Sequence, residues 1–330
     1  MEKTEPPEDT ESLSGFRRLL RLAGGESRAE MFQVAPPTAI DWGRRLDAYR
    51  RDGQWDAAAI EPAFARIRPD LEGVRFVLAP GYFTDFLAIA KRVNLSDYLE
   101  AQTDALHAAG LDVTLAPVNS QASIADNAAT LRRLVANSAK PVFLISHSKG
   151  GIDSLEFLLG ADDRLLAKVV GWLAIQAPFA GVPLADRVAE LEIIRRPSEA
   201  ILRALGGSGE SLHDLCADTR ADYLATHDKA IAALAARLPI LAVAAALDRK
   251  EGVKDRLSAT YPGLVWMRDH GIRSDSVVPT NSAILPHAPF VVLTPVDHTA
   301  IVAGGAGALS TVERKLLTKL LVALVIDGRH

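Results

Sequence analysis

Residues 143–153 read FLISHSKGGID, and this stretch decides the fold. A short apolar run ends at Ser146, Ser148 follows on a turn, and a helix is predicted to begin at Gly150. A serine held between a strand and a helix by small neighbours is typical of the nucleophile elbow, G-x-S-x-G. The pattern here is S-H-S-K-G, in which another small residue, Ser146, replaces the first glycine. An ordinary strand-to-helix turn rich in small residues fits the same letters, whereas the phosphate-binding pattern G-x-x-x-x-G-K-[ST] is absent.

On both sides of this stretch, short apolar runs alternate with segments of helical periodicity. Strands are predicted over residues 74–80, 112–117, 141–146, 169–178, 238–247, 264–267 and 290–295, and helices over 95–109, 124–139, 150–159 and 311–326. Strands that alternate with helices predict right-handed crossovers and a mostly parallel sheet. The runs are apolar throughout, which is typical of strands covered by helices on both faces. The expected fold class is therefore α/β, with a mostly parallel central sheet flanked by helices.

The alternation also sets the expected domain boundaries. Residues 1–35 are polar and predict a flexible tail, and residues 36–73 predict an N-terminal helical segment. The core is expected over 74–178 and 238–330. Between them, residues 179–237 are rich in helical signals without an obvious strand, so they predict a helical lid or cap insertion.

Composition excludes several classes of function. The net charge is −4 with no dense Lys/Arg block, which argues against a nucleic-acid partner. Cys216 is the single cysteine, so an intrachain disulfide is impossible and zinc-finger spacings are absent. No apolar run is long enough to span a bilayer, and no signal sequence is visible, so the expected location is cytoplasmic unless a leader precedes this sequence. The sequence does not indicate an oligomeric state.

A serine hydroxyl is a weak nucleophile until a base takes its proton. In folds of this kind the acid and the histidine follow the serine in that order along the chain. Asp275 lies in the loop segment SDSVVPTNSA, and His298 follows the last predicted strand. Because the carboxyl ends of parallel strands share one edge of a sheet, Ser148, Asp275 and His298 are expected to meet there.

Each choice has rivals in the sequence. Asp297 adjoins His298, which makes it awkward for that carboxylate to face the ring. The other rival acids are Asp248 and Asp269. His147 adjoins the serine but is expected to point away from it. The remaining histidines, which lack a place after a strand, are His107, His213, His227, His270, His287 and His330.

Acyl transfer also needs donors for the oxyanion. The residue after the nucleophile supplies one backbone N–H, which here is that of Lys149. The second is expected from the loop after the first clear strand, APGYFTD, and is assigned to the N–H of Tyr82. An ordinary strand-ending turn explains the same segment nearly as well.

Four pieces of sequence together resemble the α/β-hydrolase superfamily, and within it the bacterial triacylglycerol lipases and carboxylesterases. The pieces are APGY from Ala79, SHSKGG from Ser146, QAPFAGVPLAD from Gln176, and the pair SDSVVP…DH. The third is similar to the lipase segment T-P-H-x-G-S-x-x-A-D. The resemblance extends from about residue 74 to residue 305.

The resemblance implies Ser148 as nucleophile, Asp275 as acid, His298 as base, and Tyr82 and Lys149 as oxyanion donors. It implies a carboxylesterase or lipase that acts through an acyl-enzyme. The substrate expectation comes from apolar residues of the predicted lid, which suit an acyl chain or a hydrophobic ester and suit core packing equally well, namely Ile193, Ile194, Ile201, Leu202 and Leu205. Short-to-medium acyl or hydrophobic esters, polyesters included, are therefore the expected substrates. No cofactor is expected.

Two departures from the lipase pattern matter. The chain has Pro80-Gly81 where those lipases usually have H-G. Thr299 and Ala300 follow the histidine where calcium-binding lipases carry an aspartate, so no structural metal is expected. An acyltransferase, thioesterase or lactonase would use the same three residues, and a catalytically silent binding protein remains the alternative from another class.

Overall fold

The computed structural model describes residues 32–81, 97–119, 122–183, 185–186, 213–248, 261–304 and 309–328. Their centre is a seven-stranded sheet in the order β1-β9-β8-β7-β6-β4-β5. Every neighbouring pair of strands in it is parallel. The mostly parallel sheet predicted from the sequence is therefore confirmed. The strands are β1 (Ile40–Asp41), β4 (Arg75–Ala79), β5 (Asp112–Leu115), β6 (Val142–His147), β7 (Val169–Ile175), β8 (Ile240–Ala245) and β9 (Pro289–Leu293).

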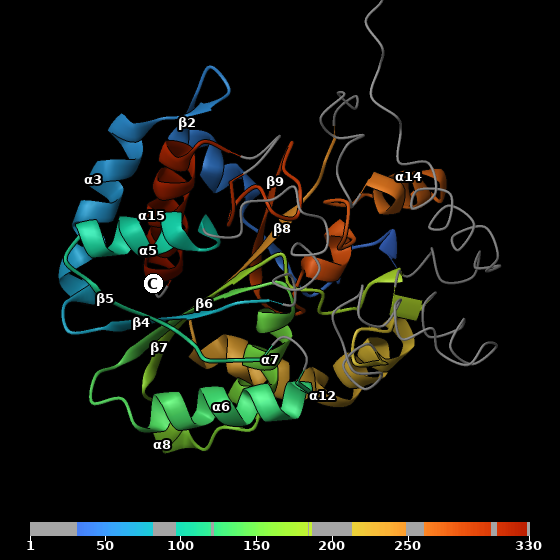
Figure 1. Ribbon diagram of the computed structural model, residues 1–330, viewed down its shortest axis with the longest axis horizontal. Helices are drawn as coiled ribbons and strands as arrows, with labels where there is room; N and C mark the ends of the chain where they lie inside the picture. Colours follow the sequence, from blue (N-terminus) through green and yellow to red (C-terminus); the bar gives the residue numbers. More distant parts are fainter. Residues whose placement is uncertain are drawn as a thin grey trace, which may run out of the picture.

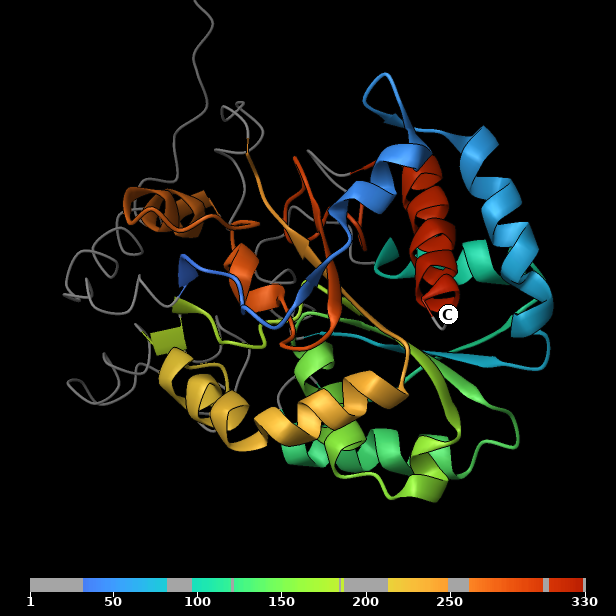
Figure 2. The ribbon, with the colours of Figure 1, turned by 180° about the vertical axis from the view of Figure 1, so that it is seen from behind.

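Helices cover both faces of the sheet. Figures 1 and 2 show α3 (Ala57–Ile67), α5 (Glu100–Ala108) and α15 (Thr311–Asp327) on one face. The opposite face carries α6 (Ile124–Ala136), α7 (Lys149–Leu159), α8 (Asp163–Leu166) and α12 (Ala217–Arg237). Each face buries its own hydrophobic cluster: in β6, Leu144 faces one cluster while Phe143 and Ile145 face the other. Successive side chains of the strand point to opposite faces, and both faces are buried, so neighbouring positions are all apolar from Val142 to Ile145.

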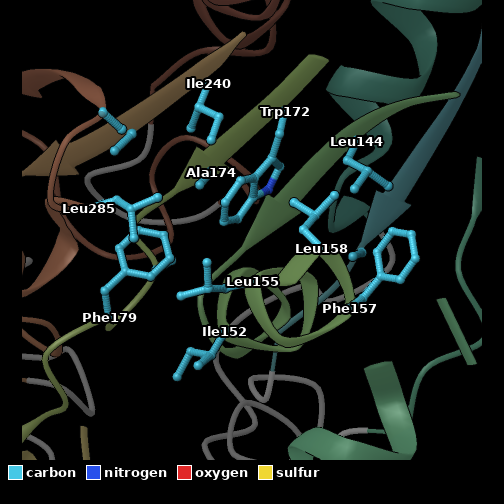
Figure 3. Close-up of a cluster of buried hydrophobic side chains, with 14 of the residues drawn as sticks. Leu144, Ile152, Leu155, Phe157, Leu158, Trp172, Ala174, Phe179, Ile240 and Leu285 are labelled. Carbon is cyan, nitrogen blue, oxygen red and sulfur yellow. The ribbon is translucent and has the colours of Figure 1, made fainter. Parts of the chain in front are cut away.

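A tight apolar layer packs the helix that follows the serine against the sheet. Figure 3 shows Leu155 and Leu158 of α7 next to Trp172 of β7, with Ile152 farther from the indole, and all four are buried. The Trp172 indole N–H also donates to Ser146 Oγ over 2.9 Å. A glycine at position 146 would leave that buried N–H without this acceptor, which accounts for the serine in the motif.

The structure differs from the predicted elements at three places. Residues 264–267, predicted as a strand, lie inside the helix α14 (Tyr261–Asp269). The strand β1 was not predicted, and it pairs with β9 at one edge of the sheet. The segment expected to be helical before the core contains α3 and two 3₁₀ helices, η2 (Gly43–Tyr49) and η3 (Arg68–Leu71), but also a small hairpin of β2 (Arg50–Arg51) and β3 (Gln54–Trp55).

Most of the predicted tail and nearly half of the predicted lid lie outside the described residues. Residues 1–31 and 187–212 are not described. At the end of the predicted tail, Phe32 is buried and its carbonyl accepts a hydrogen bond from Asn281. At the end of the predicted lid, α12 packs against α7 beneath the sheet. Within the described part of the chain, no helix combines the length and apolarity that crossing a bilayer requires.

Candidate active site

Ser148 occupies a sharp turn between β6 and α7. Its backbone has φ 52° and ψ −131°, a conformation that non-glycine residues rarely adopt. The strand end β4 lies very close to this turn, because a Cβ on Gly81 would lie 2.6 Å from Ser148 Cβ. A Cβ on Gly150 would likewise lie 2.4 Å from the Ala79 carbonyl oxygen. Strained backbone held by such tight packing is typical of functional sites.

A continuous hydrogen-bonded chain joins Ser148, His298 and Asp275. His298 Nε2 lies 3.1 Å from Ser148 Oγ, and His298 Nδ1 lies 2.8 Å from Asp275 Oδ2. The exposed fractions are 6% for Ser148, 1% for His298 and 0% for Asp275. Because a carboxylate can only accept, Nδ1 carries the proton in the neutral ring and Nε2 accepts from the serine hydroxyl. The arrangement can therefore take a proton from Ser148 Oγ.

Asp275 is held by donors on both of its oxygens. Oδ1 accepts from the backbone N–H groups of Val277 (3.0 Å) and Val278 (2.7 Å). Oδ2 accepts from Gln176 Nε2 (2.8 Å) in addition to His298. These donors give both oxygens of the fully buried side chain a partner and fix its orientation, so it can orient the ring.

The loops after β8 and β9 bring the acid and the histidine together. Leu247, just beyond β8, donates its N–H to the Ser274 carbonyl over 2.9 Å. His298, beyond β9, donates its backbone N–H to the Asp275 carbonyl over 2.9 Å. The acid loop therefore lies against the end of β8, whereas the sequence had suggested a strand at 264–267 before it.

Two of the rival acids have other partners, and the third is exposed. Asp297 accepts from the N–H groups of Thr299 and Ala300 at 2.8 Å each, so it shapes the turn that carries His298. Burial raises the pKa of the Asp297 carboxyl. Asp248 forms an exposed ion pair with Arg273, and Asp269 is exposed on α14.

Of the two predicted oxyanion donors, the structure describes Lys149 but not Tyr82. Lys149 is the first residue of α7, a position whose N–H has no acceptor within its own helix. Its Nζ is buried and pairs with Asp153 Oδ1 over 2.9 Å. Tyr82 lies outside the described residues, while its neighbour Gly81 lies directly beside the serine turn.

Two further residues contact the site and had no assigned role in the sequence. Gln176 lies just beyond β7 with φ 50°, and its Nε2 bridges Asp275 Oδ2 and the Asp297 carbonyl. It stands in the motif QAPFAGVPLAD, so the resemblance marked its position without marking its function. His147 is fully buried, with its ring centroid 4.9 Å from that of His298. Burial, and second the neighbouring His298, hold the pKa of His147 well below 6.5.

The described residues were also searched for side chains that could together hold a metal ion. Across these ranges, no three His, Cys, Asp or Glu side chains gather in a group that could bind a metal ion. The imidazole and carboxylate groups of the site are instead bonded to one another and to backbone amides.

Comparisons with known proteins agree with this architecture. A metagenomic carboxyl esterase of known structure is similar over 97% of this chain and 100% of its own, with 19% identity and a TM-score of 0.63. A Bacillus licheniformis lipase in its mature form matches over 70% of this chain and 86% of its own, with 20% identity and a TM-score of 0.53. Lipase 1 from Pelosinus fermentans matches over 76% of this chain and 98% of its own, with 14% identity and a TM-score of 0.51.

No family model and no curated protein matches the sequence. The structural similarities, the parallel sheet order and the strained strand-to-helix turn show that the chain has the α/β-hydrolase fold.

Proposed function

We propose that this chain is a serine carboxylic-ester hydrolase that acts through an acyl-enzyme. The observation that carries the proposal is the buried chain Ser148–His298–Asp275, with links of 3.1 Å and 2.8 Å, at the carboxyl edge of a parallel sheet. A nucleophile, its base and the group that orients the base are the elements that acyl transfer requires. The names of the structural neighbours, a carboxyl esterase and two lipases, support the same class of reaction.

In the proposed mechanism, His298 Nε2 takes the proton of Ser148 as its oxygen attacks the ester carbonyl. Asp275 holds the proton on Nδ1 and stabilises the imidazolium that forms. The imidazolium then protonates the leaving alcohol, which leaves an ester between Ser148 and the acyl group. Water activated by His298 hydrolyses this ester and restores the serine.

The tetrahedral oxygen would receive hydrogen bonds from two backbone N–H groups, those of Lys149 and Tyr82. Lys149 suits this role because its N–H begins a helix, where the helix dipole also favours negative charge. The proximity of Gly81 to the serine turn supports a donor from the next residue, Tyr82.

We propose short-to-medium acyl esters and hydrophobic esters, polyesters included, as the substrate class. The apolar lid residues on which this expectation rests are Ile193, Ile194, Ile201, Leu202 and Leu205, and they lie outside the described residues. The reaction needs neither metal nor organic cofactor. Acyl transfer, thioester cleavage or lactone opening would use the same three residues.

A series of p-nitrophenyl esters of increasing acyl length tests this proposal. The wild-type protein should hydrolyse them, and Ser148→Ala should reduce kcat by about 10⁶-fold because the nucleophile is gone. Near-ultraviolet circular dichroism should show the variant folded. Ester turnover that survives unchanged in Ser148→Ala would contradict the proposal, and product formed faster with an added alcohol as acceptor would favour acyl transfer.

A further inference from the structure

His147, the residue before the nucleophile, has a buried ring that the proposed mechanism does not use. Its side chain bonds at both nitrogens. Nδ1 lies 2.9 Å from the hydroxyl of Tyr98, and Nε2 lies 3.0 Å from the backbone carbonyl of His298. The side chain that precedes the serine thus contacts the loop that carries the base.

The partners fix which nitrogen carries the proton. A carbonyl oxygen can only accept, so Nε2 of His147 must donate to His298. The Tyr98 oxygen accepts from the N–H of Gly81 over 3.0 Å, which leaves its own hydroxyl to donate to Nδ1. Burial raises the pKa of Tyr98, so it keeps this proton. His147 is therefore neutral and protonated on Nε2.

This hydrogen-bonded path joins three segments that the sequence separates widely. It runs from Gly81 just beyond β4, through Tyr98 before α5, to His147 in β6 and on to the His298 loop. The same loop is held from its other side, because the His298 N–H donates to the Asp275 carbonyl. Both faces of the backbone at His298 are thus anchored.

Resting on the proposed function, we propose that His147 is a positioning residue that sets the distance between the base and the nucleophile. Through the His298 carbonyl, its Nε2–H fixes the backbone from which the catalytic imidazole reaches Ser148. Through Tyr98, its Nδ1 ties that loop to Gly81, next to the proposed oxyanion donor Tyr82. Shifts of about 1 Å in such geometry can cost on the order of 100-fold in rate.

The charge of His147 matters as well as its position. The titratable groups that face its ring are Tyr98 and His298, and the amide of Gln176 lies nearby. His298 becomes an imidazolium during the reaction. A neutral neighbour permits this charge, whereas a second imidazolium 4.9 Å away would oppose it.

Two substitutions separate the two ends of the ring. In His147→Gln, the amide nitrogen can reach the place of Nε2 and keep the bond to the His298 carbonyl. In His147→Asn, the shorter amide reaches only the place of Nδ1 and that bond is lost. His107→Gln, on the exposed side of α5, serves as the matched control.

With a p-nitrophenyl ester, His147→Asn should lose roughly 10- to 100-fold in kcat at unchanged KM. His147→Gln should stay within about threefold of the wild type, as His107→Gln does, and both position-147 variants should melt within a few degrees of each other. Wild-type kcat in His147→Asn would overturn the proposal. An equal loss in both variants at equal melting temperature would overturn it too.

Nitrogen-15 spectra of histidine-labelled protein give a readout that does not need activity. A neutral His147 ring with its proton on Nε2 at pH 6, assigned by its absence in His147→Gln, supports the hydrogen-bonded path. A charged ring or an Nδ1–H ring overturns it. If the wild type hydrolyses no ester, the proposed function fails while the spectra still decide the state of His147.

Discussion

At Asp275, two oxygens have different tasks. Oδ1 accepts two backbone N–H groups, and Oδ2 accepts the Nδ1–H of His298 and the amide of Gln176. A carboxylate satisfies all four donors at once, whereas an amide offers one acceptor and one donor. The identity of this side chain therefore decides which tautomer the histidine adopts.

In Asp275→Asn, the amide oxygen should take the place of Oδ1, because two N–H groups point there. The NH₂ group then faces His298 and favours the ring with its proton on Nε2, which cannot accept from Ser148. We expect kcat to fall by about 10⁴-fold with the fold retained. Asp269→Asn, an exposed rival acid on α14, is the matched control and should leave kcat unchanged. Steady-state ester kinetics that put Asp275→Asn within tenfold of the wild type would refute the assignment.

The sequence predicts those site residues that a local motif or a neighbouring strand marks. Ser148 stands in a motif, and His298 follows a strongly apolar strand, so their positions could be inferred. Gln176 and His147 also stand in quoted motifs, but their roles could not be inferred there, since these roles arise from contacts between segments far apart in the chain. Only the folded sheet edge brings those partners into contact.

Among the elements, long apolar runs predicted their strands well, and short ones did not. Residues 264–267 are a run of four apolar residues, which fits a strand or one turn of a helix equally well. In the structure they lie in α14, two of them, Leu264 and Met267, buried at a spacing of one helical turn. β1 has two residues and no periodicity, and it is a strand only because it pairs with β9.

The start of the helix α7 is held in place by a buried ion pair as well as by its own helical hydrogen bonds. Its first turn buries an ion pair, Lys149 Nζ to Asp153 Oδ1 at 2.9 Å, and Asn127 of α6 donates to the other carboxylate oxygen. Burial raises the pKa of Asp153 to about 6, although Lys149 and Asn127 lower it. The pair ties the start of α7 to its second turn and to α6, and so supports the serine turn.

Across the whole molecule, buried titratable groups couple stability to pH. The pKa of His147 is well below its ordinary value of 6.5 in the folded protein, so the unfolded chain binds this proton first. Stability is therefore lost as pH falls below about 6.5. Asp153 acts in the opposite direction between pH 3.8 and about 6, because its pKa is raised in the folded state.

Comparing the wild type with His147→Gln isolates the effect of His147 on the pH dependence of stability, since both chains contain Asp153. The wild-type advantage in the free energy of unfolding should shrink as pH falls from 7.5 to 5.5, by up to about 1.4 kcal/mol per pH unit below 6.5. Urea unfolding at several pH values measures it. The free energy of unfolding of His107→Gln should follow that of the wild type at every pH. If the difference in the free energy of unfolding between the wild type and His147→Gln stays constant with pH, that contradicts a buried neutral ring at position 147.

The central claim is that the folded chain makes the hydroxyl of Ser148 nucleophilic, and labelling with a fluorophosphonate tests it most directly. Peptide mass spectrometry of the labelled protein should find one stoichiometric adduct, on Ser148. The adduct should be absent from Ser148→Ala and from heat-unfolded protein. An adduct on another residue, or none on native protein, would contradict the account.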